Sequence, residues 1–305
     1  MNRFLTFRNP GFKSKPSDPD PGQGVRDPSR RKFLRRTSGL MALGLAASYP
    51  FLMERYMVRV NHYRLAVKDL PAGFNGFRIV HLSDLHYGPL VPLSWLRNVF
   101  DLARKQNPDL IALTGDYVWG QEAVDYLEVI WTEMEKLSAP FGVRMVLGNH
   151  DHWAGGNVAL ELLESSGRSL RNRAETLTRG KDRLIVGGVG DLLEDKVLID
   201  KALAGRDEKV PRIVLAHNPD TADLDYSSRV DLFLCGHTHG GQVNIPFVGT
   251  PVLPVRNKNY NYGIRKTPRS VAFINKGIGW AMLPVRFNCA PEIAVLHLVP
   301  KERDK

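Results

Sequence analysis

Five apolar segments that each end at a histidine, aspartate or asparagine constrain the fold of this chain more than any other feature. Short apolar runs bounded by turn residues are typical of buried β-strands. Polar residues at the ends of such strands converge on one rim of an α/β sheet, where sites form. The segments are Phe77–Asp84, Asp109–Asp116, Val143–His150, Arg212–His217 and Val230–His237. We therefore expect one site that draws residues from most of the length of a domain.

The segment ends carry residues that bind metals. Asp84 is followed two positions later by His86, and His237 by His239. In extended backbone, residues i and i+2 point the same way, so each pair would offer two ligands to one small volume. The candidate ligands are four imidazoles and three side-chain oxygens: Asp84, His86, Asp116, Asn149, His217, His237 and His239. Seven ligands exceed the four of a tetrahedral zinc ion, which predicts two divalent ions bridged by Asp116. Mixed nitrogen and oxygen ligands favour Zn, Fe or Mn.

Taken singly, these residues have ordinary structural interpretations. Asp84 could cap a helix and Asp116 could form a turn. A lone histidine in an apolar run, such as His81 or His297, is more often structural than a ligand. The occurrence of all five segments in one chain favours the metal centre.

The order of apolar and amphipathic segments predicts an α/β domain over residues 56–302. Strand, helix, strand, helix and strand alternate between Phe77 and Val146, which is typical of a sheet with helical cover. The predicted helices are Leu93–Lys105, Gln121–Leu137 and Asn157–Ser166. Further strands are predicted at 58–67, 184–192, 271–279 and 292–299. We expect sheets that mix parallel and antiparallel strands.

The net charge of +10 is concentrated at the N-terminus. Residues 1–60 hold twelve Lys/Arg and four Asp/Glu, whereas the other 245 residues hold 30 basic and 28 acidic side chains. The net charge is therefore +8 in the first part and +2 in the second. Because nucleic-acid-binding domains carry a basic patch on their folded surface, we expect no nucleic-acid partner.

Residues 1–55 are predicted to direct the protein to its location. Residues 9–28, rich in Pro, Gly, Asp and Lys, are typical of disorder. Arg30 and Arg31 precede the apolar stretch Thr37–Met53, and this pattern resembles a bacterial twin-arginine signal. The alternative is an ordinary anchoring helix, although the stretch is short for a bilayer span. We expect export by the twin-arginine machinery to the periplasm or the outer face of the inner membrane, with the signal either cleaved or kept as an anchor at the membrane surface.

The ligand-bearing blocks also resemble a known family. The blocks Asp84-Leu85-His86, Gly115-Asp116, Gly148-Asn149-His150-Asp151, His217 and Gly236-His237-Thr238-His239 follow the pattern of the calcineurin-like metallophosphoesterases. The extension to GHTHGGQ resembles a bacterial subgroup that is twin-arginine exported or membrane-associated. The resemblance covers roughly residues 57–299 and implies a four-layer αββα sandwich with the metal site at the carboxyl ends of the strands.

The resemblance also implies a role for each site residue. It places Asp84, His86 and His239 on one ion and Asn149, His217 and His237 on the other, with Asp116 bridging. His150 and Asp151 are the candidate catalytic residues. His150 would face the substrate and donate to a phosphate oxygen or leaving group, and Asp151 would orient or polarise it.

Such a centre predicts a metal-dependent hydrolase of phosphoric esters. Two adjacent cations lower the pKa of a shared water and hold phosphoryl oxygens, so we expect attack by a metal-bridging hydroxide without a phosphoenzyme. The predicted enzyme is a monomeric phosphodiesterase or pyrophosphatase for phospholipid or other cell-envelope phosphoesters. One alternative is cleavage of the UDP-2,3-diacylglucosamine lipid precursor, as in some relatives of the subgroup. The other is a non-catalytic scaffold, which the intact ligand set disfavours.

One further segment has two interpretations. Residues 245–291 contain seven basic side chains and no acidic one. They form either a solvated loop face or an electropositive lip beside His239 that binds an anionic head group. In the second case Arg256 and Arg265 would contact phosphate through their forked guanidinium groups. Tyr260 would stack on a sugar or base.

Overall fold

The computed structural model describes residues 28–302, so most of the predicted disordered stretch at 9–28 lies outside the described residues. The chain divides into two compact units, one up to Ala47 and one from Ser48 onward. Helix α1 (Pro28–Leu52) makes up the described part of the first unit and extends into the second. Among the described helices, none combines the length and hydropathy that crossing a membrane requires.

The second unit begins before the predicted boundary at residue 56, because residues 48–55 are bonded to the folded domain. The backbone N–H of Arg286 donates to the Pro50 carbonyl at a distance of 3.1 Å. The Glu54 carboxylate is buried and accepts from the backbone N–H of Cys289 at 2.9 Å.

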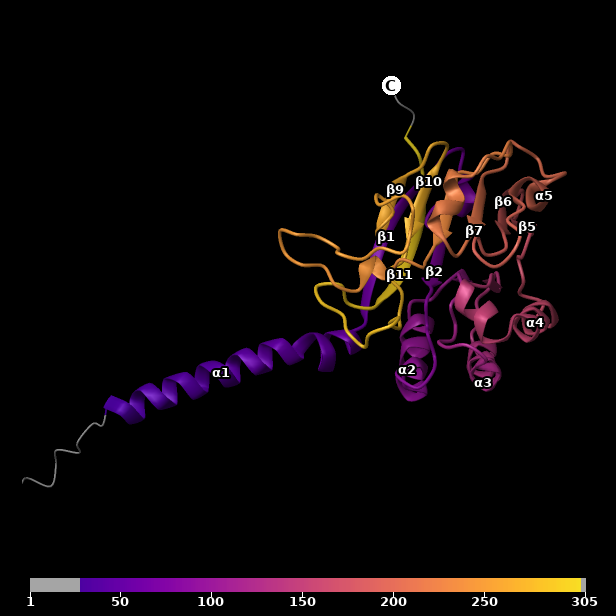
Figure 1. Ribbon diagram of the computed structural model, residues 1–305. Helices are drawn as coiled ribbons and strands as arrows, with labels where there is room; N and C mark the ends of the chain where they lie inside the picture. Colours follow the sequence, from indigo (N-terminus) through magenta and orange to yellow (C-terminus); the bar gives the residue numbers. More distant parts are fainter. Residues whose placement is uncertain (1–27, 303–305) are drawn as a thin grey trace, which may run out of the picture. The chain divides into compact units, whose positions relative to one another are not determined.

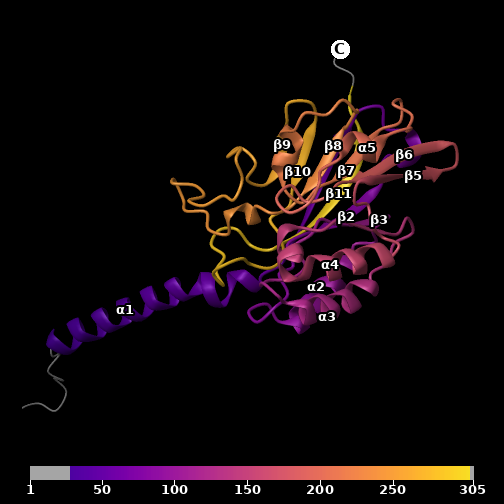
Figure 2. The same ribbon diagram turned by 45° about the vertical axis from the view of Figure 1, so that its right-hand side comes forward.

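Two mixed sheets form the centre of this unit (Figures 1 and 2). In the first sheet, β11 is antiparallel to β2, and the other neighbours are parallel. Its strands, in spatial order, are β1 (Arg59–Val67), β11 (Glu292–Pro300), β2 (Arg78–Leu82), β3 (Leu110–Leu113) and β4 (Val143–Met145).

The second sheet is parallel at its centre and antiparallel at both edges. Its strands, in spatial order, are β5 (Arg173–Arg179), β6 (Asp182–Gly188), β7 (Arg212–Leu215), β8 (Leu232–Cys235), β10 (Val271–Ile274) and β9 (Gly263–Lys266). The prediction of mixed sheets is therefore confirmed.

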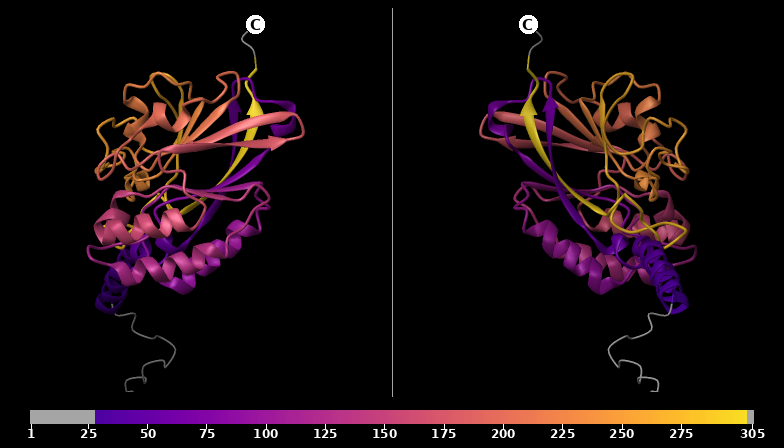
Figure 3. Two further views of the ribbon diagram at one scale, coloured as in Figure 1. Left: turned by 90° about the vertical axis from the view of Figure 1, so that its right-hand side faces the viewer. Right: turned by 90° about the vertical axis from the view of Figure 1, so that its left-hand side faces the viewer.

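The alternation of side chains along each strand builds the layers. In β2, Ile79 packs between the two sheets, whereas Val80 and Leu82 pack against the helices. The helices α2 (Leu93–Arg104), α3 (Val124–Glu135) and α4 (Asn149–Ser165) cover the outer face of the first sheet. They lie together on one side of the sheets in Figure 3.

The outer face of the second sheet has a thinner cover. It consists of α5 (Ile199–Leu203), the 3₁₀ turn η3 (Pro219–Asp223) and loop residues such as Val255 and Tyr260. Two mixed sheets flanked by helices match the predicted α/β fold class, with a fourth layer made mostly of loop rather than of long helices.

All five apolar segments predicted to be buried strands contain one: β2, β3, β4, β7 and β8. The edge strands β5 and β9 were not predicted. Helix α4 begins at Asn149, and the Asp151 carboxylate accepts from the Gly148 N–H at 2.9 Å. This bond from the N-cap amide to the third helical residue ties the start of the helix to the end of β4. The helix is kinked at Gly155, whose backbone is not helical, and the predicted helix Asn157–Ser166 corresponds to the part after the kink.

Candidate metal centre

The predicted ligands meet at the carboxyl ends of strands from both sheets. The loops after β2 and β3 and the start of α4 contribute from the first sheet, and the loops after β7 and β8 contribute from the second. Backbone bonds hold these loops together. The Asp84 N–H donates to the Gly115 carbonyl, and the Gly236 N–H donates to the His217 carbonyl, each at a distance of 2.9 Å. The two sheets are joined where the His237 N–H donates to the Asp84 carboxylate at 3.0 Å.

Five of the seven predicted ligands have a left-handed backbone conformation, with φ between 49° and 68°: Asp84, His86, Asp116, His237 and His239. The extended backbone predicted for the Asp84–His86 and His237–His239 pairs is therefore wrong. A left-handed non-glycine residue costs on the order of 1–3 kcal/mol and persists only where its surroundings hold it, most often at functional sites. Here the strained turns aim both members of each pair into one volume.

The first ligand cluster consists of Asp84, His86 and His239, all buried. The Nε2 atoms of the two histidines lie 2.9 Å apart, and Asp84 Oδ1 lies 3.4 Å from Nε2 of His239. Burial lowers the pKa of His86 to about 3 and holds the pKa of His239 well below its ordinary value. Both rings are therefore neutral, which is the form that binds metal.

The second cluster consists of Asp116, His217 and His237. Nε2 of His217 lies 3.0 Å from Nδ1 of His237. The opposite nitrogens are engaged: Nδ1–H of His217 donates to the Thr114 carbonyl at 2.7 Å, and Nε2–H of His237 donates to the Pro254 carbonyl at 2.9 Å. Bonds of this kind fix the orientation of each ring and aim its inner nitrogen at the centre. Burial lowers the pKa of His217, but the Asp116 carboxylate raises it to about 10, so a metal would displace a proton from this inner nitrogen.

Asn149 is buried, and its side-chain Oδ1 has no hydrogen-bond partner among residues 28–302. A buried amide oxygen without a partner is costly, since the great majority of such groups are hydrogen-bonded. A metal ion at this centre would supply the missing partner, so the donor set fits the predicted metal.

Asp116 faces both clusters. Its Oδ2 lies 3.3 Å from Nε2 of His217 and 3.6 Å from Nε2 of His86, while Oδ1 accepts the backbone N–H of His150 at 2.9 Å. Burial raises the pKa of Asp116, but the neighbouring histidines, His217 first, hold that pKa well below its ordinary value. Its carboxylate is therefore charged and placed to be shared.

Two glycines lie so close to ligand carboxylates that no side chain would fit at their positions. A Cβ on Gly148 would lie 2.3 Å from Oδ1 of Asp116, and a Cβ on Gly236 would lie 2.4 Å from Oδ2 of Asp84. Neither approach is sterically possible, so the backbone at these turns packs directly on the ligands.

His150 lies beside the clusters in a cage of rings. It stacks on Trp119, with centroids 4.4 Å apart, and meets the edges of Trp153 and His86 at 4.6 and 4.9 Å. A ring nitrogen of His150 lies within 4.8 Å of ligand atoms of His86 and Asp116. Burial lowers its pKa. The ring is held at the edge of the centre, where a substrate would meet it.

The structure corrects the role predicted for Asp151. Its carboxylate does not contact the His150 ring. It is fully buried and accepts from three backbone N–H groups: Gly148 and Asp116, both at 2.9 Å, and Tyr117 at 2.7 Å. Asp151 is therefore a positioning residue that holds the Asp116 turn against the start of α4.

The three residues predicted to contact substrate lie in different surroundings. Tyr260 is buried and donates its hydroxyl to Asp223 at 2.5 Å, so its ring is not available to stack on a sugar or base. Arg256 is exposed, and its backbone N–H donates to Asp220 at 2.6 Å. The Arg265 guanidinium donates to the side chain of Asn261, a residue whose carbonyl accepts the Thr238 hydroxyl at 2.5 Å. It therefore reaches the ligand loop through Asn261.

Arg286 is a further residue of the centre that the sequence analysis did not single out. Its guanidinium is fully buried and donates to the carbonyls of Lys276, Gly277, Gly279 and Cys289. One of its nitrogens lies 3.4 Å from Nδ1 of His239. Because its partners are backbone carbonyls, no spacing of residue types could have identified it.

Comparisons with known proteins agree with this geometry. Residues 77–241 match the profile of the calcineurin-like phosphoesterase family. The chain is 32% identical over 278 residues to an uncharacterized metallophosphoesterase of Bacillus subtilis, YkuE, covering 88% of this chain and 97% of that protein. It is 34% identical over 278 residues to the phosphodiesterase YaeI of Escherichia coli, covering 89% and 99%.

A more distant relative is the UDP-2,3-diacylglucosamine pyrophosphatase LpxG of Chlamydia trachomatis, which is 24% identical over 303 residues, covering 80% of this chain and 90% of that protein. With the family profile spanning the ligand-bearing segments and the clusters assembled in space, the chain belongs to the calcineurin-like phosphoesterase family and is a metal-dependent hydrolase of phosphoric esters.

Proposed function

We propose that this protein is a two-metal phosphodiesterase or pyrophosphatase that acts on a phospholipid or another phosphoester of the cell envelope. The observation that carries the proposal is the pair of ligand clusters, Asp84/His86/His239 and Asp116/His217/His237, with Asp116 facing both. Mixed nitrogen and oxygen donors suit Mn, Fe or Zn. The relatives YaeI and LpxG are named as a phosphodiesterase and a pyrophosphatase, and both names support cleavage of a phosphate with two substituents.

When bound, a pair of such ions supplies an activated water and neutralises charge on phosphoryl oxygens. The chain's own contribution is to hold the ligands and to place His150 at the edge of the centre. Stacked on Trp119, the His150 ring can donate to a phosphoryl oxygen or to the departing oxygen, a role worth about 10²–10⁴-fold in rate.

We also propose that the N-terminal segment directs the protein to the outer face of the cytoplasmic membrane. The paired arginines Arg30 and Arg31 before an apolar stretch support twin-arginine export. A second candidate is cleavage of UDP-2,3-diacylglucosamine, supported by the likeness to LpxG. That reaction needs an active site on the cytoplasmic side, so the location of the domain distinguishes the two candidates.

The test is a hydrolysis assay with protein reconstituted with Mn, Fe or Zn, which compares a soluble bis-ester, a mono-ester and a lipid pyrophosphate. We expect the bis-ester or the pyrophosphate to be cleaved faster than the mono-ester, and Asp116→Asn to abolish turnover. If metal-loaded protein hydrolyses none of the three substrates, the proposal is wrong. Undiminished activity of Asp116→Asn would exclude the shared carboxylate.

A further inference from the structure

Two loops beside the metal centre, together with the end of α1, expose large apolar side chains. We call six of these residues the apolar rim: Phe51, Leu52, Phe247, Val248, Met282 and Leu283. Phe247 is fully exposed, and Met282 and Val248 are 79% and 74% exposed. Large apolar side chains gathered on one surface mark an interaction site more often than scattered ones do.

Hydrogen bonds join the two loops to each other and to the end of α1. The Asn244 N–H donates to the Phe287 carbonyl at 2.8 Å, which ties the loop at 243–252 to the loop at 280–288. The second loop is tied in turn to the end of α1, through the bond from Arg286 N–H to the Pro50 carbonyl and through Arg55, which donates to the Pro284 carbonyl at 3.3 Å. In Figure 1 the orange loop at 243–252 and the yellow loop at 280–288 lie on the same side of the domain.

The same loops border the metal centre. The loop at 243–252 begins directly after the turn His239–Gly241, and Gln242 donates to the Ala281 carbonyl at 2.9 Å. The loop at 280–288 carries Arg286, which lies 3.4 Å from the His239 ring. A surface that covers the apolar rim would therefore lie next to the site of hydrolysis.

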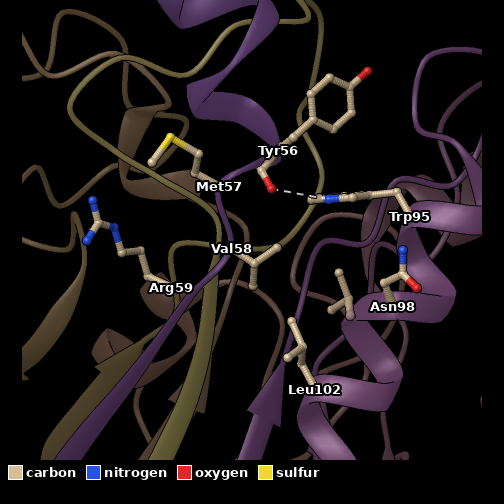
Figure 4. A pocket seen from close by; sticks show the side chains of 8 residues that line it. Tyr56, Met57, Val58, Arg59, Trp95, Asn98 and Leu102 are labelled. Atoms are coloured by element: carbon tan, nitrogen blue, oxygen red, sulfur yellow. Dashed lines mark hydrogen bonds between the residues drawn. The ribbon is translucent and has the colours of Figure 1, made fainter.

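The segments that carry the rim are basic in sequence, which favours an anionic surface. Residues 232–291 contain seven basic side chains and no acidic one. Arg256 and Lys258 among them are exposed, whereas Arg286 is fully buried and Arg269 pairs with Asp225. Arg59, the first residue of β1, is exposed and forms part of the walls of two pockets of about 510 and 440 Å³. The larger pocket is lined mainly by apolar groups such as Met57, Trp95 and Leu102 (Figure 4).

Continuity with α1 favours a bilayer over a soluble partner. The helix exposes Leu40, Met41, Leu43 and Leu45, and the same run of apolar residues continues into Phe51 and Leu52 of the rim. Apolar side chains flanked by cations are the composition of segments that insert into the interface of anionic membranes. Basic residues near such a surface add electrostatic attraction to the anionic lipids.

We propose that the apolar rim inserts into the interface of a lipid bilayer, so that the metal centre opens beside the head-group layer. The proposal deepens the proposed function and rests on it for the substrate, a phosphoester presented by the membrane. The docking itself involves no catalysis and is tested separately.

The docking test places a fluorescent probe on the rim of the full-length chain. Cys235 and Cys289 are 0% and 3% exposed, so a cysteine introduced by Phe247→Cys or Met282→Cys can be labelled selectively with an environment-sensitive dye. Val129→Cys on α3, another exposed apolar position, is the matched control. On vesicles of phosphatidylethanolamine and phosphatidylglycerol, we expect blue-shifted emission and quenching by spin-labelled acyl chains at positions 247 and 282 but not at 129.

Tethering of the chain through α1 would bring every probe close to the vesicle. The depth of each probe in the bilayer, measured by acyl-chain quenching, therefore decides whether the rim inserts. Equal quenching at all three positions, or none at 247 and 282, would overturn the proposal. A blue shift that grows with protein concentration in the absence of lipid would instead identify a second copy of the chain as the occupant, and would overturn it too.

The second test separates docking from chemistry. We expect Phe247→Asp/Met282→Asp to cleave a soluble bis-ester at the wild-type rate, and to cleave the same phosphoester embedded in vesicles about tenfold or more slowly, because burial of each apolar side chain is lost. An equal loss of cleavage rate on the soluble and the embedded substrate, or no loss on either, would contradict the proposed role of the apolar rim. Absence of activity on every substrate by wild type would count against the proposed function and leaves the probe measurement to decide the docking.

Discussion

His150 and Asp151 are neighbours at the start of α4, yet their side chains lie in different surroundings. The His150 ring is caged by Trp119, Trp153 and His86 at the edge of the metal centre. The Asp151 carboxylate is turned away from it, toward backbone amides of the Asp116 turn. One residue therefore faces the substrate side and the other supports a ligand.

This difference predicts that substitutions at the two adjacent residues affect different properties, catalysis at His150 and stability at Asp151. His150→Ala should leave folding and metal content intact and lower kcat by about 10²–10⁴-fold, as for a general acid. Asp151→Ala should leave three buried N–H groups unpaired and lower the free energy of unfolding by about 3 kcal/mol or more. Urea unfolding, metal analysis and steady-state kinetics on both variants check this. If His150→Ala lost metal, or Asp151→Ala unfolded like wild type, the division of roles would be incorrect.

The ligand histidines show which features of the site could be predicted from the sequence. His217 and His237 could be predicted as ligands because they end apolar runs. Which nitrogen each offers depends on the carbonyls of Thr114 and Pro254, which accept from the opposite nitrogens. These carbonyls belong to the backbone, so the residue types at 114 and 254 contain no signal for them. Arg286, bonded to four backbone carbonyls, escaped prediction for the same reason.

At the scale of the element, strands were predictable and turns were not. The runs that became β2, β3, β4, β7 and β8 are apolar because both faces of each strand are covered. The edge strand β9 has an alternating half-buried and exposed pattern over Gly263–Lys266, which gives too short a periodic signal. The turn at Asp84–His86 was predicted to be extended. Its left-handed residues are held by contacts with other loops, which lie far away in the sequence.

The turn between β4 and α4 yields a prediction that compares two glycines close together in the chain. Gly148→Ala would push a Cβ to 2.3 Å from Oδ1 of Asp116 and 2.8 Å from Cε1 of His217, so we expect loss of bound metal and of activity. Gly156→Ala, in α4, would place a Cβ 3.4 Å from Nδ1 and 3.9 Å from Cβ of His152, which is ordinary van der Waals contact. That variant should keep full metal content and change stability by less than about 1 kcal/mol, because Gly156 follows the kink at Gly155 and its added Cβ meets no ligand.

Metal content by elemental analysis and stability by urea unfolding decide between these outcomes. A Gly148→Ala protein that binds metal as wild type does would mean that the turn relaxes without moving Asp116. Loss of metal in Gly156→Ala would mean that any change in α4 disturbs the centre, and the steric argument at Gly148 would lose its force.

At the scale of the whole molecule, the metal centre is also the place where the two sheets are joined at their carboxyl ends. Asp84, His86, Asp116 and Asn149 come from the first sheet and its helix, and His217, His237 and His239 from loops of the second. Burial, charge and left-handed backbone all make this cluster costly without a ligand. Metal binding therefore supplies stability to the folded domain as well as chemistry.

Removal of metal should consequently lower the melting temperature of the whole domain. At a free metal concentration about 100 times Kd, one bound ion stabilises the folded state by about 2.7 kcal/mol, which corresponds to about 5–10 °C for a domain of this size. We expect a chelator to lower Tm by at least that amount, and Mn or Zn to restore it. Thermal unfolding of wild type and Asp116→Asn, with and without chelator, measures the effect. The variant should melt at a temperature that depends less on metal, because the carboxylate that faces both clusters is gone. A wild-type Tm that does not respond to chelation and metal addition would show that the ligands do not couple the two sheets.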